Sequence, residues 1–445
     1  MNNFLPIKGI SQGSNYTSST AKKRWVKMKK LLQSKRFGSA IPLAIVMVLI
    51  LFAMGTGLLS MGLNSRTFAI RSTSDIEARC AADAGLTMAL FSMNKELQAK
   101  PLGVNILPKA IDEKIPYCDS TFSYTVTSDI DNEYSVLSIG RSGQAQRAVS
   151  ATLELRGLFE YAILTKESLI LKSDTIVDGY NSQDPIDTDV DVDLSIQSTA
   201  DASVILNTGV VVKGDISVGV GGNPDTVIKD MGATTGDQFA ALIEDPLPLI
   251  YPPPLPDMGT NITATAETIT ITTADSGQYN NIFVKKGKTL GAVEISGDVV
   301  LYITGDIEIG ESCELINKDN SSLTLYIDGD IHCRANCAIN TEFPPEDPKT
   351  FQIYGTNETQ QTFDIKAKND WSGTIYAPNA DVILYANGDF YGSTVSNNFE
   401  LKAGGNYHYD EALREVSVDD IGVRFVVKRW YGGNPKSING VSITR

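Results

Sequence analysis

Four aspartates, Asp187, Asp189, Asp191 and Asp193, alternate with uncharged residues in one short segment. If this segment forms a strand, all four carboxylates lie on one face. Such a cluster requires solvation by water or neutralisation by a cation, and Ca²⁺ prefers oxygen ligands of this kind. The segment lacks the glycine-rich spacing of calcium loops, so we expect a solvated acidic strand. A Ca²⁺ site is the alternative, and no other cofactor is expected.

Histidine is scarce in this chain. There are two, His332 and His408, so a Ser-His-Asp or Cys-His mechanism would need one of them beside a nucleophile. A site at His408 is one alternative. We expect residues 406–410, around His408, to form a hydrogen-bonded turn that closes the last repeat of the fold. No catalytic residue is assigned, and the chain is not expected to be an enzyme.

Five cysteines allow at most two disulfides. Cys80 lies on the predicted long helix and Cys118 precedes the first strand predicted after it. An exported location would permit a disulfide between them, and two free or buried thiols are the alternative. Cys313 and Cys337 occupy equivalent positions in the repeat described below. We expect these two to stack in a core, with a Cys313–Cys337 disulfide as the second alternative and zinc binding as the third. No metal ligand is assigned.

Seven aromatic residues gather toward the C-terminal end, in turn-rich sequence where we expect several to face solvent. Aromatic rings beside Asn and Asp suit carbohydrate or protein binding, and packing inside the fold is the alternative. The seven residues are Tyr376, Tyr385, Tyr391, Tyr407, Tyr409, Trp430 and Tyr431.

An apolar segment near the N-terminus decides on which side of a membrane all of these groups lie. Residues 37–65 contain no charge, and eight Lys/Arg residues precede them within residues 22–36. As a helix, residues 40–63 would span about 36 Å, enough to cross a bilayer. The basic flank favours the cytoplasm, so everything after residue 65 is expected to be exported.

The net charge of the chain differs in sign on the two sides of this segment. Residues 1–38 carry nine Lys/Arg and no acid, so the chain's net charge of −15 leaves −24 for residues 39–445. An acidic exported part argues against nucleic acid as a partner. Residues 1–27 are rich in small polar residues and are expected to be disordered.

The junction Lys35-Arg36-Phe37-Gly38-Ser39-Ala40 resembles a class III, type IV prepilin-like signal. The segment AADAGL, residues 81–86, resembles the AAEAGL stretch of the PilX-like minor pilin N-terminal family, and the similarity covers about residues 36–95. It implies cleavage between Gly38 and Ser39 by a prepilin peptidase, and assembly with other pilins through a long helix. Major pilins carry Glu at the fifth mature position, where this chain has Leu43. An uncleaved membrane anchor is the alternative.

Two further regions follow the helix. Residues 121–128, 134–141 and 147–155 alternate apolar and polar positions, which predicts three antiparallel strands packed on the helix. Beyond residue 159 the phrase LYITGDI, at residues 301–307, returns as LYIDGDI 24 residues later. A repeat of this length in β-rich sequence favours a parallel β-helix in which Gly-Asp forms a corner, with a β-sandwich as the alternative.

Residues 159–413 also resemble an uncharacterised β-helical, polymer-forming-like domain that is often fused to PilX-like N-termini. The phrases that carry the similarity are VDGYNS at 177–182, the Pro-rich segment 245–259, IYAPN at 375–379, FYG at 390–392 and HYDEAL at 408–413. The resemblance implies a right-handed parallel β-helix.

We therefore expect a mainly β protein with a long N-terminal α-helix. The predicted parts are a leader (1–38), a transmembrane and amphipathic helix (39–98), a small antiparallel head (99–156), a β-helix (157–413) and C-terminal capping strands with a tail (414–445). The predicted function is that of a minor pilin or pilin-like surface protein, single-pass, with an exported domain that is structural or adhesive toward carbohydrate or protein. The alternatives are a membrane-anchored polysaccharide-active enzyme and a self-polymerising, bactofilin-like scaffold.

Overall fold

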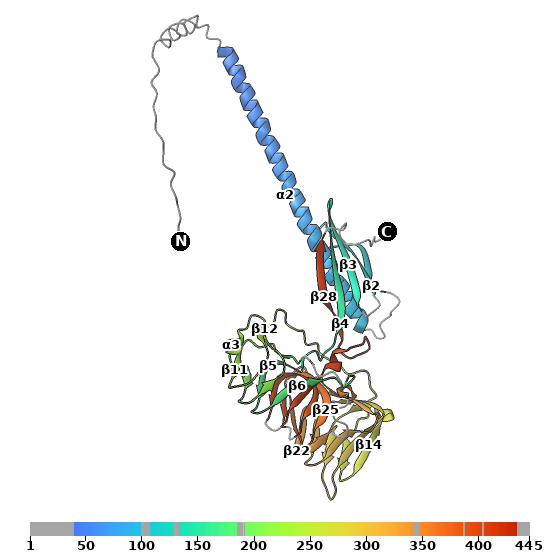
Figure 1. The fold of residues 1–445 in the computed structure, drawn as a ribbon. Coiled ribbons are helices and arrows are strands. Elements are labelled where there is room, and N and C mark those ends of the chain that lie inside the picture. The colour runs from blue at the N-terminus through green and yellow to red at the C-terminus, as the bar shows by residue number, and fades with distance from the viewer. Residues whose placement is uncertain are drawn as a thin grey trace, which may run out of the picture. The chain divides into compact units, whose positions relative to one another are not determined.

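The computed structural model describes residues 40–98, 107–128, 133–184, 190, 192–340, 347–385, 388–402 and 405–433. The fold is mainly β with one long N-terminal helix (Figure 1). The chain divides into two units, Met1–Ser74 and Asp75–Arg445. The leader, including Gly38 and Ser39, lies outside the described residues, so its processing stays a prediction.

Helix α2 (Ala40–Gln98) is unbroken over 59 residues. In the first unit every residue from 40 to 73 is exposed, and the side chains as far as Ser65 are uncharged. The helix is long and apolar enough to cross a membrane. An exposed apolar surface of this length requires an apolar environment, because water does not solvate it favourably.

In the second unit, α2 packs on a five-stranded antiparallel sheet, which we call the head sheet. Its order is β1-β2-β3-β4-β28, and the three predicted strands are present as β2, β3 and β4. The pattern missed the edge strand β1, and it predicted a strand in the region of the other edge strand, β28, but not its partner. The bounds are β1 (Lys109–Lys114), β2 (Thr121–Ser128), β3 (Tyr134–Ser142), β4 (Ala145–Arg156) and β28 (Arg424–Gly433).

Small residues bring the helix close to the head sheet. Ala78, Ala81 and Ala82 are completely buried. A Cβ atom on Gly140 of β3 would overlap the Ala78 carbonyl oxygen and the Ala82 backbone nitrogen, so only glycine fits there. A Cβ on Gly85 would likewise overlap the Ser138 hydroxyl. The AADAGL segment is therefore a close-packing surface.

The Gly140→Val substitution tests this contact. The added side chain must push α2 away from β3, and overpacking of this kind costs about 1–3 kcal/mol. We expect that loss in the free energy of unfolding, measured by denaturant titration of the full chain in detergent. The matched control is Ser150→Val on β4, which is only partly buried and should change stability by much less. Equal losses for the two variants would show that the helix does not approach the sheet at Gly140.

Strand β28 corrects the expectation that residues 414–445 cap the β-helix. It pairs antiparallel with β4, from Arg424 opposite Arg156 to Gly433 opposite Ala148. Alternation of apolar and polar residues predicts a strand but does not identify its partner. Strand β28 pairs with the exposed edge of β4 in the head sheet and not with the end of the stacked strands. Everything between β4 and β28 is thus inserted into the head sheet. Residues 434–445 lie outside the described part of the chain.

The described residues of the inserted region form 23 strands with parallel pairings and a core separate from that of the head. We call residues 161–413 the stacked domain. Its strands are β5 (Ile163–Leu171), β6 (Ile176–Tyr180), β7 (Leu194–Ile196), β8 (Val204–Leu206), β9 (Val211–Val212), β10 (Ile216–Val218), β11 (Ile228–Asp230), β12 (Gln238–Ala240), β13 (Ile262–Thr265), β14 (Thr268–Thr272), β15 (Gly277–Tyr279), β16 (Ile282–Lys285), β17 (Ala292–Ser296), β18 (Asp298–Ile303), β19 (Ile307–Ile309), β20 (Glu314–Asn317), β21 (Ser322–Ile327), β22 (Ile331–Ile339), β23 (Phe351–Gly355), β24 (Gln361–Ala367), β25 (Trp371–Leu384), β26 (Phe390–Leu401) and β27 (Tyr407–Asp410).

The predicted 24-residue repeat is confirmed in register. Strand β18 pairs in parallel with β21, with Leu301 opposite Leu325 and Ile303 opposite Ile327. These inward side chains are buried, and each coil of strands covers the core of the next.

Stacking order differs from chain order. Along one column of strands the order is β15-β18-β21-β23-β25-β26-β5-β7-β10-β12. The first strand of the domain, β5, therefore lies in the middle of the stack against β26. Residues 241–261 run from the coil of β12 to that of β13, and Figure 1 shows β12 and β14 at opposite ends. We call the β26–β5 and β27–β6 contact the seam.

The Gly-Asp phrase has a structural reason at the corners. The Asp306 backbone N–H donates to Asn281 Oδ1 (2.8 Å), and the Asp330 N–H donates to Asp306 Oδ1 (2.9 Å). The Thr362 N–H continues the ladder to Asp330 Oδ1 (2.7 Å). A Cβ on Gly329 would overlap the Gly305 carbonyl oxygen, so glycine permits the close stacking that the ladder needs.

Two substitutions of Asp306 distinguish the effect of its hydrogen-bond acceptor from the effect of its negative charge. Asp306→Ala leaves the Asp330 N–H without its partner and should cost about 1 kcal/mol, whereas Asp306→Asn keeps the accepting oxygen and should cost less. Denaturant unfolding of the full chain gives both values. If the Asn variant is as destabilised as the Ala variant, the hydrogen-bond ladder is not what Asp306 contributes.

Candidate functional site

The acidic run is only partly described. Asp187, Asp189 and Asp191 lie outside the described residues, so the Ca²⁺ alternative stays a prediction. Asp193 directly precedes β7, and its Oδ2 forms an ion pair with Arg414 Nη2 (3.2 Å). Among the described residues, no group of three His, Cys, Asp or Glu side chains is arranged to hold a metal ion.

The disulfide pattern differs from both predicted pairings. Cys337 is bonded to Cys333, across the irregular part of β22. Cys313 is a buried free thiol, and its carbonyl accepts from the Ala338 N–H (3.0 Å), so Cys313 and Cys337 stack on neighbouring coils as the first alternative expected. Sequence spacing could not show that β22 bulges enough to bring residues 333 and 337 together.

Cys80 and Cys118 are both exposed and free, so the predicted disulfide between them is wrong in this structure. Cys80 lies on α2 between residues that face the head sheet, and the Cys118 thiol donates to the Ser120 hydroxyl (3.1 Å). The helical period could not reveal which side of α2 carries Cys80, because small residues surround it.

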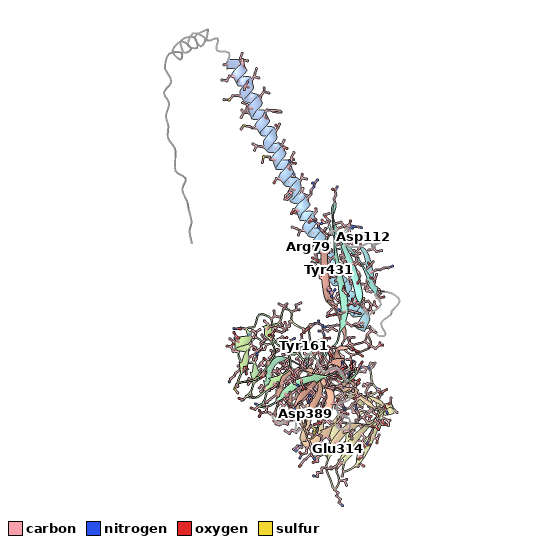
Figure 2. All side chains as sticks on the ribbon, in the orientation of Figure 1. Arg79, Asp112, Tyr161, Glu314, Asp389 and Tyr431 are labelled. Atoms are coloured by element: carbon pink, nitrogen blue, oxygen red, sulfur yellow. A yellow bond between two sulfur atoms is a disulfide. The ribbon has the colours of Figure 1, made fainter. Side chains whose placement is uncertain are left out.

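The aromatic residues do not form one exposed cluster. Tyr376, Tyr407 and Tyr409 are completely buried. Only Tyr385, Trp430 and Tyr431 are well exposed, and the last two lie on β28 of the head sheet, where Figure 2 labels Tyr431. The expectation that several of these rings face solvent is wrong for these three tyrosines, and the alternative, packing inside the fold, holds for them. Inward positions of a stacked coil accept aromatic rings as readily as aliphatic side chains.

The segment around His408 is strand β27, not the expected turn, yet it does close the last coil. The Tyr407 hydroxyl donates to the Ala162 carbonyl (2.9 Å) and the Tyr409 hydroxyl donates to the Phe159 carbonyl (2.8 Å). These buried bonds join the end of the stacked domain to its beginning. Sequence analysis identified VDGYNS and HYDEAL as signature phrases but could not show that they pair with each other at the seam.

His408 itself sits on the outer face of the seam. Its Nδ1 contacts Asp178 Oδ1 across the β27–β6 pairing, and its Nε2 lies 3.4 Å from Asp389 Oδ2. Its ring stacks on Tyr391, and Lys213 pairs with Asp178 (3.0 Å). Burial acts to lower the pKa of His408, but Asp178 and Asp389 outweigh it and raise the pKa above the usual histidine value.

The His408→Gln variant tests this contact through pH. Because the folded-state pKa is raised, the stabilisation is fully present below the unfolded pKa of about 6.5 and is lost as pH rises through the folded value. We expect a loss of about 2 kcal/mol in unfolding free energy at pH 5.5 and a clearly smaller loss at pH 9. His332→Gln, at an exposed histidine, is the control and should show no such difference. A His408→Gln loss independent of pH would contradict the ion pair.

A cavity of about 950 Å³ lies where the stacked domain joins the head sheet; we call it the junction cavity. Asp245, at the start of the Pro-rich segment, accepts from the Tyr161 hydroxyl (2.7 Å) and from Arg156 (3.3 Å), and lies 3.6 Å from Arg424. Burial and Asp245 together raise the pKa of Tyr161. Figure 2 labels Tyr161 at this side of the stacked domain.

The elements around the junction cavity are held by paired groups. Asn94 of α2 accepts from the Phe425 N–H (2.7 Å) and donates to the Phe425 carbonyl (3.1 Å), so it fixes the start of β28. Burial raises the pKa of Glu160, against the opposing effect of Arg156. The Tyr161 hydroxyl beside the Asp245 carboxylate is the hydroxyl–carboxylate pair described at this cavity. Its chemistry suits binding of apolar side chains beside carboxylates.

Comparison with known proteins gives limited matches. A model described as a domain of unknown function (DUF7305) matches residues 257–416. No curated protein matches the chain. The competence-associated pilin ComZ from Thermus thermophilus is a structural neighbour at 13% identity, covering 81% of this chain and 98% of that chain with a TM-score of 0.26. A score that low carries no argument about the fold.

Proposed function

We propose that this chain is a minor pilin or pilin-like surface protein that is anchored by α2 and displays the stacked domain outside the cell. A prepilin peptidase would cleave between Gly38 and Ser39. The helix would then hold the protein in the inner membrane, or in a filament through the helices of other pilins.

One observation carries this proposal, namely that a single helix has two different surfaces. Residues 40–73 are exposed and apolar as far as Ser65, whereas the segment from Ala78 to Leu97 packs on the head sheet through small residues. A globular domain does not need the first part. A lipid bilayer or a bundle of similar helices would cover it.

The stacked domain suits display. Parallel pairing in repeated coils is the pairing of a parallel β-helix, and we propose the right-handed form. Its insertion between β4 and β28 ties it to the head by two chain connections, which favours a rigid extension over a flexible tether. We propose a structural or adhesive role, with no catalytic activity.

The mature N-terminus tests the processing step. In cells that contain a prepilin peptidase, mass spectrometry of the membrane-extracted protein should find a chain that begins at Ser39. Gly38→Leu should reduce that species at least tenfold and leave the uncleaved chain. The leucine side chain would have to fit in the peptidase site where glycine has only a hydrogen atom.

Gly13→Leu, in the leader but far from the junction, is the matched control and should be processed normally. An uncleaved wild-type chain, recovered with its basic leader, would leave a plain membrane-anchored surface protein instead of a filament subunit.

A further inference from the structure

The junction cavity has an unusual combination of apolar surface and unpaired acidity. Leu242 and Ile243 at its rim are 94% and 82% exposed, and Phe239 is 47% exposed. Isolated exposed apolar residues need no explanation, but several around one hollow mark an interaction site.

Charge around the cavity is unbalanced. Four carboxylates line it against two guanidinium groups, Arg156 and Arg424. Asp245 is paired with both arginines, and Asp193 is paired with Arg414. Asp215 and Glu244 form no ion pair in the described part of the chain, although Asp215 accepts the Asp237 N–H (2.7 Å). A partner for this cavity therefore needs apolar and basic groups together.

The part of α2 just beyond the membrane-spanning length has that composition. Residues 64–74 carry Arg66 and Arg71 and no acid, and neither arginine forms an ion pair within the described residues. Phe68 is 76% exposed and Ile70 is 57% exposed. Phe68 and Arg71 are three residues apart, so they share one face of the helix.

We propose that residues 66–74 of a second copy of this chain dock at the junction cavity, with Phe68 against Leu242 and Ile243 and Arg71 beside Glu244.

The geometry of such a contact is informative. Two parallel copies with Arg71 of one beside residues 90–94 of the other are offset by about 30 Å along the helix. A contact between two different surfaces does not close on itself, so it repeats from copy to copy. The inference rests on the proposed filament, in which neighbouring copies are staggered, and adds a specific subunit contact to it.

Cross-linking of the full-length chain in detergent, where two copies are free to stagger along the helix, tests the contact. In a Cys80→Ser, Cys118→Ser background, which removes the exposed thiols, Ala69→Cys and Leu242→Cys are placed on two differently tagged copies. A short bismaleimide should join them into a mixed dimer. Leu290→Cys, on an exposed residue away from the cavity, is the matched control for Leu242→Cys and should give at least fivefold less product.

Charge reversal supplies a second readout. Arg71→Glu on the copy carrying Ala69→Cys should lower the cross-linked yield at least fivefold, and Glu244→Arg on the other copy should restore it. Equal yields with Leu242→Cys and Leu290→Cys, no product, or no response to either reversal would overturn the inference. Cleavage after Gly38, scored on the same samples, reports separately on the proposed function.

Discussion

The return of the chain from the stacked domain to β4 constrains the whole fold. Because β28 completes the head sheet, the inserted domain must begin and end at neighbouring positions. A simple stack of coils begins at one end and finishes at the other, a full stack length away. This chain meets the constraint by beginning in the middle, at β5, and by crossing from one end to the other through residues 241–261. This arrangement creates the seam, where the last strands of the domain pair with the first ones. Buried hydrogen bonds from the Tyr407 and Tyr409 hydroxyls hold the seam together.

The helix obeys a second constraint, since its two parts meet different environments. The part that packs on the head sheet uses alanine and glycine, so the distance between helix and sheet is set by backbone atoms at Gly140. The preceding part is apolar without any such partner in the described structure. Each part alone has a conventional explanation. Their continuity in one helix is the observation on which the proposed function rests.

Local pattern predicted much of this fold. The uncharged run, the alternation in β2, β3 and β4, and the return of LYITGDI reflect short-range periodicity, and the structure has a helix, three strands and a repeat in the predicted register there. The partner of β28 and the position of β5 within the stack depend on long-range contacts, which periodicity does not encode. The site residues follow the same division. Sequence indicated His408, the phrase VDGYNS that contains Asp178, and the segment from Asp245 onward. The pairing of Asp178 with His408 and of the arginines with Asp245 became visible only when distant strands were placed together.

Native-state hydrogen exchange on the full chain in detergent tests the central claim, that β28 completes the head sheet. The account predicts that backbone amides of β28 paired with β4 exchange slowly and lose protection together with those of β4 as denaturant rises, because they belong to one sheet. The contrary result is fast exchange throughout β28 while β4 stays protected. That outcome would make β28 a loose C-terminal strand, and the reason for the seam and the reordered coils would disappear.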